Sequence, residues 1–234
     1  MSALKLAVIG DGKMGHLVRA LAQEQHVDVV AFLGADAVHA HGISAETLNG
    51  ATVAIEFTQP DAAAANIRAC AAAGCAVVCG TTGWDAERAI VNNEVRAAGG
   101  ALLWAPNFSI GVHIFTALVA EAARRAHEAG GFGVHLIETH HTAKLDAPSG
   151  TARQLAHAAG RAGHAPVAIT SVRVGSVPGT HELVIDGTFE QIRLVHEARD
   201  RRVFALGALA AARWIVDRRG VFTLDDMLAA PGGS

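Results

Sequence analysis

The 234-residue sequence has few charged residues, few cysteines and no long apolar run, and each shortage excludes a class of protein. Charged residues make up 18% of the chain and the net charge is −3, so no basic surface for nucleic acid is expected. No apolar run reaches membrane-spanning length, and the opening "MSALKLAVIGDG" is typical of a strand and glycine turn rather than a signal peptide. We therefore expect a cytoplasmic protein without nucleic-acid or membrane partners.

The three cysteines, Cys70, Cys75 and Cys79, are spaced irregularly and have Ala, Val and Gly as neighbours. Zinc sites use paired ligands at regular short spacing, and reactive thiols need an electropositive setting. The sequence therefore predicts small buried residues in a reducing compartment, and no metal site.

The first half of the chain alternates short apolar runs with helical patterns. Hydrophobic residues make up 51% of the chain, enough for a substantial core. Apolar runs that end in glycine or turn residues are typical of buried parallel strands. Here such runs alternate with helical patterns and are joined to them by short connections. The pattern predicts a doubly wound α/β sheet, with strands at 4–10, 27–34, 51–58, 75–80 and 101–109 and helices following residues 12, 61 and 84.

The pattern changes after about Ser109. A long helix at 111–129 is followed by a strand of mixed polarity and a second helix beginning near Thr151. Three further strands follow, the last two separated by Asp186-Gly187, a hairpin signal. This half predicts an α+β domain with a mixed, mostly antiparallel sheet. The apolar helix near 203–219 is compatible with packing on either domain.

The segment "GDGKMG" places Gly10, Gly12 and Gly15 between the first strand and the first helix. A pyrophosphate needs close backbone N–H groups at a helix N-terminus, so this context favours dinucleotide binding over an ordinary turn. The acidic residue that usually ends the second strand is absent, because Gly34 stands there and Asp36 follows two residues later. Lys13 is either a contact for a 2′-phosphate or a surface lysine, so NADH and NADPH both remain open.

Two later loops follow strands of the same predicted sheet: "GTTG" at 80–83 and "APNFS" at 105–109. Ligands on such sheets bind beyond the carboxyl ends of the strands. We expect these loops to shape the nicotinamide end of the site, although glycine and asparagine also form ordinary turns.

The segment "ETHHTAKLDAPSGTA" leaves a strand and enters a helix. The N–H groups of Gly150 and Thr151, at the start of that helix, are expected to bind a carboxylate, and Lys144 adds positive charge. With His140 or Lys144 as a proton donor, the segment suits hydride reduction of a C=N or C=O bond. The alternative is a polar loop in which Asp146 is a turn residue or a partner of the lysine.

These motifs together resemble the 4-hydroxy-tetrahydrodipicolinate reductase family. "HHTAKLDAPSGTA" is close to the family signature, and "IEFTQPDA", "GTTGW", "APNFSIGV" and "RVGSVPGTHELVIDG" extend the resemblance along the chain. The resemblance implies NADH- or NADPH-dependent reduction of a cyclic dicarboxylate in lysine and diaminopimelate biosynthesis. It also implies a Rossmann-like dinucleotide-binding domain of residues 1–109 plus 202–234, a substrate-binding and oligomerisation domain of residues 110–201, and a homotetramer.

The resemblance also assigns roles to individual residues. It places His140 and Lys144 at the reacting centre, with Lys144 the principal proton donor. Contacts to the substrate would come from His141, Lys144, Gly150, Thr151 and Arg201. The residues that would line the cofactor site are Gly10, Gly12, Lys13, Met14, Gly15, Gly80, Thr82, Ala105, Asn107 and Phe108.

The sequence departs from the family near the cofactor. Gln59 stands where some members have a basic residue, and the acidic residue after the second strand is out of place. Two alternative functions remain open on sequence: a reductase for another imino or keto acid on the same plan, and a dinucleotide-binding sensor without catalysis.

Overall fold

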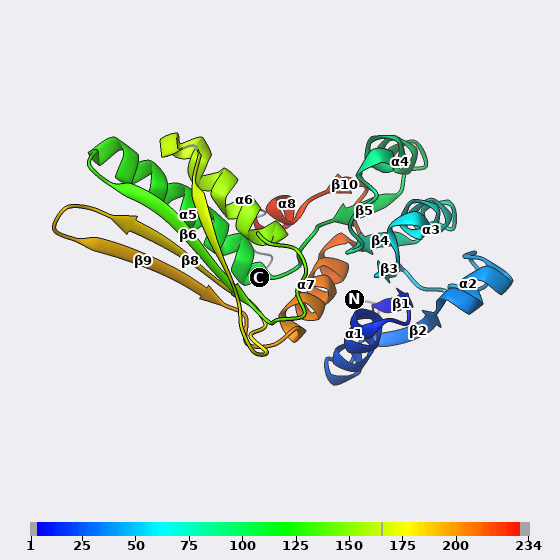
Figure 1. Cartoon of the computed structure of the whole chain (residues 1–234). Coiled ribbons are helices and arrows are strands. Elements are labelled where there is room, and N and C mark those ends of the chain that lie inside the picture. Colours follow the sequence, from blue (N-terminus) through cyan, green and yellow to red (C-terminus); the bar gives the residue numbers. More distant parts are fainter. Residues whose placement is uncertain (1–3, 165, 230–234) are drawn as a thin grey trace. The chain divides into compact units, whose positions relative to one another are not determined.

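The computed structural model describes residues 4–164 and 166–229, which form two compact units (Figure 1). The first unit extends to Phe108 and resumes at Arg202, and the second comprises Ser109–Arg201. Ser109, the last residue of the expected first domain, caps helix α5 (Ile110–Ala129): its side chain accepts a hydrogen bond from Val112 N at 3.2 Å.

The first unit is built on a six-stranded sheet in which every pair of neighbouring strands is parallel. Its order is β10-β5-β4-β3-β1-β2. The strands are β1 (Lys5–Ile9), β2 (Asp28–Leu33), β3 (Val53–Glu56), β4 (Ala76–Cys79), β5 (Ala101–Trp104) and β10 (Gly220–Phe222). The predicted doubly wound sheet is confirmed. The short edge strand β10 was not predicted, because three residues are too few to show a pattern.

Helices cover both faces of this sheet (Figure 1). Helices α1 (Lys13–Glu24) and α7 (Arg202–Ile215) pack on one face, and α3 (Pro60–Ala72) and α4 (Asp85–Ala97) on the other. Alternate residues of β1 face the two layers: Leu6 and Val8 join one core, Ala7 and Ile9 the other. The stretch between the second and third strands, which showed no clear pattern in the sequence, contains α2 (Ala35–His41), and α8 (Leu224–Ala229) ends the described chain.

Helix α7 packs in the first unit, which settles a question that periodicity left open. Its residues Ala205, Ala208 and Leu209 lie in the core that α1 also covers. A Cβ at Gly207 would lie 1.8 Å from the carbonyl oxygen of Phe108, so glycine allows the helix to approach that backbone closely.

The three cysteines lie in the other core of the same unit, as small buried residues. Cys70, Cys75 and Cys79 are unpaired, and burial raises the pKa of the Cys75 thiol to about 12. The predicted packing role of the cysteines is confirmed. Among the described residues, no helix has both the length and the apolar character needed to span a bilayer.

The second unit is built on a four-stranded sheet of order β7-β6-β8-β9. Its strands are β6 (Gly133–His140), β7 (Ala168–Arg173), β8 (Thr180–Asp186) and β9 (Gln191–Glu197), and only the β6–β7 pair is parallel, as the mostly antiparallel prediction requires. Helices α5 and α6 (Gly150–Ala159) pack over one face, where Leu136, Leu183 and Ile185 are buried. A turn at Gly160–His164 follows α6, and its helical path is interrupted at Gly163, which has φ +106°.

Candidate functional site

The three glycines of "GDGKMG" serve three different purposes between β1 and α1. Gly10 has φ +105°, and a Cβ there would lie 2.0 Å from the carbonyl oxygen of Phe57. A Cβ on Gly15 would lie 1.9 Å from the carbonyl oxygen of Gly10, so this glycine lets α1 pack on the loop. Gly12 caps α1 without a side-chain bond, and a Cβ there would point into open space. The first and third glycines therefore shape the loop, and the second leaves room for a ligand.

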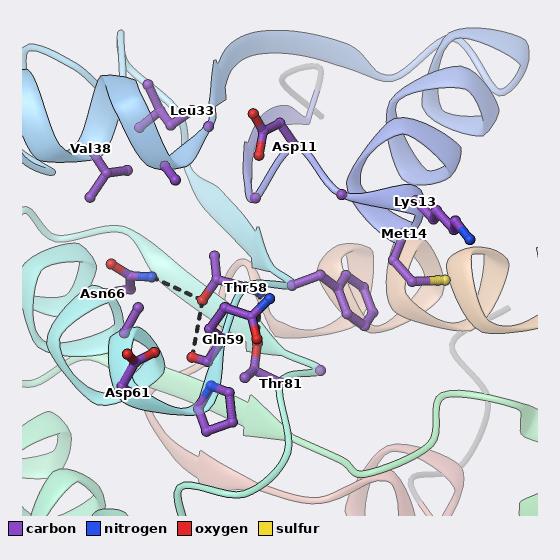
Figure 2. Close-up of a pocket in the computed structure, with 18 of the residues that line it drawn as sticks. Asp11, Lys13, Met14, Leu33, Val38, Thr58, Gln59, Asp61, Asn66 and Thr81 are labelled. Atoms are coloured by element: carbon purple, nitrogen blue, oxygen red, sulfur yellow. Dashed lines mark hydrogen bonds between the residues drawn. The ribbon is translucent and has the colours of Figure 1, made fainter. Parts of the chain in front are cut away.

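A cavity of about 920 Å³ opens at this loop (Figure 2). It lies where β1 and β3, adjacent in the sheet, lead to α1 and α3 on opposite faces, which is the topological switch point of the sheet. Of the predicted cofactor residues, six line this cavity: Gly10, Gly12, Lys13, Met14, Gly80 and Thr82. The other four do not: Gly15, Ala105 and Phe108 are buried in the fold, and Asn107 is half-buried.

The loops after β3 and β4 both line the cavity; the sequence predicted the second as part of the cofactor site and marked only Gln59 in the first. Thr58 N donates to Thr81 Oγ1 at 2.8 Å, which ties the two loops together. The carbonyl oxygen of Thr81 accepts from the indole N–H groups of Trp84 at 2.9 Å and Trp104 at 3.0 Å. A Cβ on Gly80 would lie 1.9 Å from the Phe57 ring, so Gly80 also has a packing role.

Glu56, at the end of β3, is a buried carboxylate next to these two loops. It accepts hydrogen bonds from Thr58 Oγ1, from Asn66 Nδ2 at 3.3 Å and from Cys79 Sγ at 3.1 Å. These partners come from three different elements, so their convergence was not visible in the sequence. The network fixes the start of the loop that carries Thr58.

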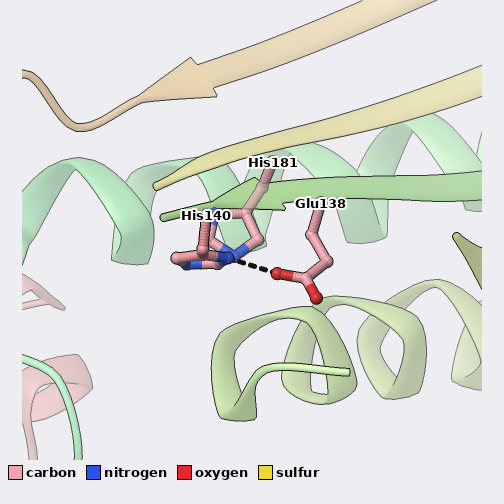
Figure 3. Close-up of side chains that lie close together, drawn as sticks. All are labelled: Glu138, His140 and His181. Atoms are coloured by element: carbon pink, nitrogen blue, oxygen red, sulfur yellow. Dashed lines mark ion pairs between the residues drawn. The ribbon is translucent and has the colours of Figure 1, made fainter. Parts of the chain in front are cut away.

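In the second unit, the carboxyl end of β6 carries a buried polar cluster (Figure 3). Glu138 and His140 lie on the helix-covered face of the strand, and the Glu138 carboxylate lies directly against His140 Nδ1. His181 of β8 lies against His140, with ring centroids 5.2 Å apart. The cluster is completed by Arg173 of β7, whose Nη2 lies 2.8 Å from Glu138 Oε1.

Burial and pairing set the charges in this cluster. Burial alone would raise the pKa of Glu138, but hydrogen bonds from Arg173 and Ser171 lower it to about 2. Burial lowers the pKa of His140 from its ordinary value, against the opposing attraction of Glu138. Burial also lowers the pKa of His181, to about 4. Near neutral pH the cluster therefore contains a carboxylate, a guanidinium and two neutral imidazoles.

The loop that follows β6 carries Lys144 to a half-buried position. Lys144 N donates to the His141 carbonyl oxygen at 3.1 Å, which forms a turn, and Lys144 Nζ lies 2.7 Å from Asp146 Oδ1. Arg173 Nη2 donates to the backbone carbonyl of Asp146 at 2.6 Å. Asp146, for which the sequence left two roles open, is thus the partner of the lysine, and the hydrogen bond from Lys144 lowers the pKa of its carboxyl.

The same loop ends at the N-terminus of α6. Ser149 is buried, its Oγ accepts from Ala152 N at 3.1 Å, and its own N–H donates to Glu138 Oε1 at 3.4 Å. Gly150 is exposed at the first position of the helix, and Thr151 follows it half-buried. The Ser149 cap thus fixes the first turn of α6, which carries Gly150 and Thr151.

The remaining predicted substrate contacts occupy different surroundings. His141 lies just past the end of β6 and is half-buried, while its neighbour His140 is 8% exposed. Arg201 is exposed at the last position of the second unit, directly before α7. Sequence analysis missed the partners Glu138, Arg173 and His181; only the alternation of polar residues at 138 and 140 on a strand could have indicated the first of them.

Three of these side chains also satisfy the spacing of a metal site. Glu138, His140 and His181 each offer a ligand atom, and these atoms lie within 4.8 Å of one another. The pairing of Glu138 with Arg173 already balances the carboxylate charge. We interpret the cluster as a hydrogen-bonding and ion-pair network.

Comparison with known proteins gives the same result for both units. The chain matches the family profile "Dihydrodipicolinate reductase, N-terminus" over residues 4–108 and the corresponding C-terminus over residues 111–228. The 4-hydroxy-tetrahydrodipicolinate reductase of Xanthomonas euvesicatoria is 38% identical over 240 residues, and that of Christiangramia forsetii is 32% identical over 238 residues. Each alignment covers 97% of this chain and 98% of the relative.

Solved structures agree in fold. A dipicolinate-bound dihydrodipicolinate reductase from Paenisporosarcina sp. TG-14 aligns with a TM-score of 0.76 at 22% identity, covering 94% of this chain and 97% of that one. An amine dehydrogenase from Mycobacterium smegmatis aligns with a TM-score of 0.57 at 11% identity, covering 96% of each chain.

Proposed function

Because this chain belongs to the dihydrodipicolinate reductase family, we propose that its two units divide the family reaction between them. The chain is a nicotinamide-dependent oxidoreductase that reduces 4-hydroxy-tetrahydrodipicolinate to tetrahydrodipicolinate in lysine biosynthesis. The balanced reaction consumes one hydride and one proton and releases water. The first unit holds the cofactor, and the second holds the substrate and supplies the proton.

The cavity of the first unit fits a nicotinamide dinucleotide. Gly12 leaves space beside the first turn of α1, and the cap of that helix has no side chain to compete with a pyrophosphate. The bound cofactor supplies the hydride. The lining residues Thr58, Gln59 and Thr81 offer polar atoms from two loops that are tied together. These loops, together with the predicted glycines, orient the dinucleotide.

The second unit offers two kinds of group for a dicarboxylate substrate. The first turn of α6, with Gly150 and Thr151, provides backbone N–H groups and the positive end of the helix dipole. Lys144 provides an ammonium group on the loop that leads into that turn. We assign one substrate carboxylate to the helix N-terminus, with His141 and Arg201 as further contacts.

The proton comes from Lys144. The lowered pKa of His140 keeps its imidazole neutral near pH 7, so His140 carries no extra proton to give. The ammonium of Lys144 also stabilises the negative charge that hydride addition develops on the substrate. The observation that carries this assignment is the position of Lys144, half-buried between the buried His140 cluster and the N-terminus of α6.

A coupled assay tests the proposed function. The product of dihydrodipicolinate synthase should be reduced by the purified protein, with the loss of NADH or NADPH followed by absorbance. Simple 2-keto acids serve as the control and should give no turnover. A protein that binds the dinucleotide but turns over neither substrate would contradict the proposal.

We further propose that the protein is a cytoplasmic homotetramer in which the open face of the second sheet forms contacts. That face, opposite α5 and α6, exposes Val172 on β7 and Val195 on β9, which are 38% and 57% exposed. Exposed apolar residues on one sheet face are typical of subunit contacts. Light scattering after size exclusion should give four chains for the wild-type protein and fewer for Val195→Glu.

A further inference from the structure

The end of β2 lacks the acidic residue that usually binds the adenosine ribose, and another side chain occupies its place. Gly34 follows Leu33 directly, and a Cβ built on Gly34 would lie 2.4 Å from Asp11 Oδ2 and 2.7 Å from Asp11 Cγ. Asp11 stands between the first two glycines of the loop. Its carboxylate therefore fills the position that a side chain at Gly34 would otherwise enter.

Asp11 is available to a ligand. It is exposed and lines the same cavity as Gly12 and Gly34, and Figure 2 shows it on the side of the cavity where Leu33 lies. In dinucleotide-binding sheets of this type, the adenosine ribose lies over the carboxyl end of the second strand, and a carboxylate there accepts bonds from its hydroxyls. The geometry places one carboxylate, from the loop instead of the strand, at that end.

The charges around the cavity favour a ribose without a phosphate. Among the described residues that line it, Lys13 is the one lysine or arginine, and in Figure 2 Lys13 lies beside Met14, on the opposite side from Leu33. His39 also lines the cavity, from α2. A 2′-phosphate carries a charge of about −1.5 to −2 near pH 7, and close to Asp11 it would meet a like charge.

We propose that Asp11 binds the adenosine ribose hydroxyls and makes the enzyme prefer NADH to NADPH. This inference rests on the proposed cofactor site, and it assigns to a loop residue the specificity that related sheets take from the end of β2. It also explains Gly34: a larger residue there would displace the Asp11 carboxylate.

The test compares kcat/KM for NADH and NADPH in the wild-type enzyme and in Asp11→Asn, which removes the charge and keeps the shape. We expect the wild-type ratio to favour NADH by about tenfold or more, and Asp11→Asn to reduce the ratio at least about fivefold. Asp36→Asn is the matched control, because Asp36 is an exposed aspartate two residues from Gly34 that does not line the cavity. It should leave the ratio within about twofold of wild type.

A second variant moves the carboxylate to the strand. Asp11→Ala/Gly34→Asp removes the Oδ2 and Cγ atoms that would collide, and Gly34 has φ −79°, which aspartate adopts without strain. We expect it to recover most of the NADH preference that Asp11→Ala loses.

Calorimetric titration with NADH and with NADPH provides a readout that does not need turnover. If the protein binds NADH more tightly and Asp11→Asn loses that preference, the inference stands even if the reductase assay fails. A wild-type protein that binds both dinucleotides equally or prefers NADPH overturns it. An unchanged ratio in Asp11→Asn, or an equal change in Asp36→Asn, overturns it as well.

Discussion

The two candidate sites of this chain are built from different materials. The site of the first unit is mainly backbone: glycines, a helix N-terminus and two loops tied by Thr58 and Thr81. The site of the second unit is mainly side chains: a buried carboxylate, two imidazoles and a guanidinium below the loop that carries Lys144. A backbone site tolerates loss of a side chain but not an added one, whereas the buried cluster depends on every charge having its partner.

The largest effect should come from Glu138→Gln, which breaks the buried network. The carboxylate is fully buried and pairs with Arg173, so its loss leaves a guanidinium without its counter-charge. We expect the free energy of unfolding to fall by about 3 kcal/mol or more. Chemical denaturation followed by circular dichroism measures this. Tryptophan fluorescence would not report on the second unit, because all three tryptophans lie in the first unit.

Glu121→Gln is the control for that variant. Glu121 also pairs with two arginines, Arg124 and Arg125, and their hydrogen bonds lower its pKa to about 2, but it lies on the exposed surface of α5. We expect no measurable loss of stability. Equal losses in the two variants would show that burial is not what makes the Glu138 cluster sensitive.

Lys144→Ala should have the next largest effect, and on catalysis rather than folding. Removal of the proposed proton donor should lower kcat by about 10²-fold or more, while the loop keeps its fold. Asp146→Asn, which removes only the ion-pair partner, should change kcat far less. A loss of under about threefold in Lys144→Ala would remove the lysine from its assigned role.

His181 should make the stability of the second unit depend on pH. Its folded pKa is about 4 and its ordinary value is 6.5, so the unfolded state binds the proton first as the pH falls. The contribution of His181 to the free energy of unfolding is therefore fully present above about pH 6.5 and is lost as the pH falls toward 4. Between pH 7 and pH 5 the free energy of unfolding should fall by about 2 kcal/mol from this group. Denaturation curves of wild type and His181→Gln at pH 7, 6 and 5 measure the difference. Parallel pH dependence in the two proteins would contradict the assignment.

The two sites also differ in how far the sequence predicted them. Gly10, Gly12 and Gly15 were recognisable because glycine spacing reports backbone conformations that few other residues adopt. Strands β1 to β5 of the first sheet followed from continuous apolar runs, whereas the three-residue β10 did not. Glu138, His181 and Arg173 were not recognised as a group, because they come from three strands and no local spacing connects them. Glu56 and its partners escaped for the same reason.

The position of α7 illustrates a third case. Its pattern predicted a buried helix but not the unit in which it is buried, because apolar periodicity indicates a face and not a partner. Only the family resemblance pointed to the first unit, and the contact of Gly207 with Phe108 accounts for it physically. Asp11 was not predicted as a ribose contact, because the dinucleotide-binding motif places its acidic residue at the end of the second strand and not in the glycine loop.

The central claim is that the dinucleotide and the proton donor belong to different units, and one titration tests it directly. NADH is titrated calorimetrically into wild type, Gly12→Ala and Lys144→Ala. Gly12 has ordinary φ and ψ and open space around its Cβ position, so Gly12→Ala should fold normally but bind NADH about tenfold more weakly, because its methyl group enters the pyrophosphate position. Lys144→Ala should bind NADH as wild type does. Equal weakening by the two variants, or unchanged binding in Gly12→Ala, would contradict the account.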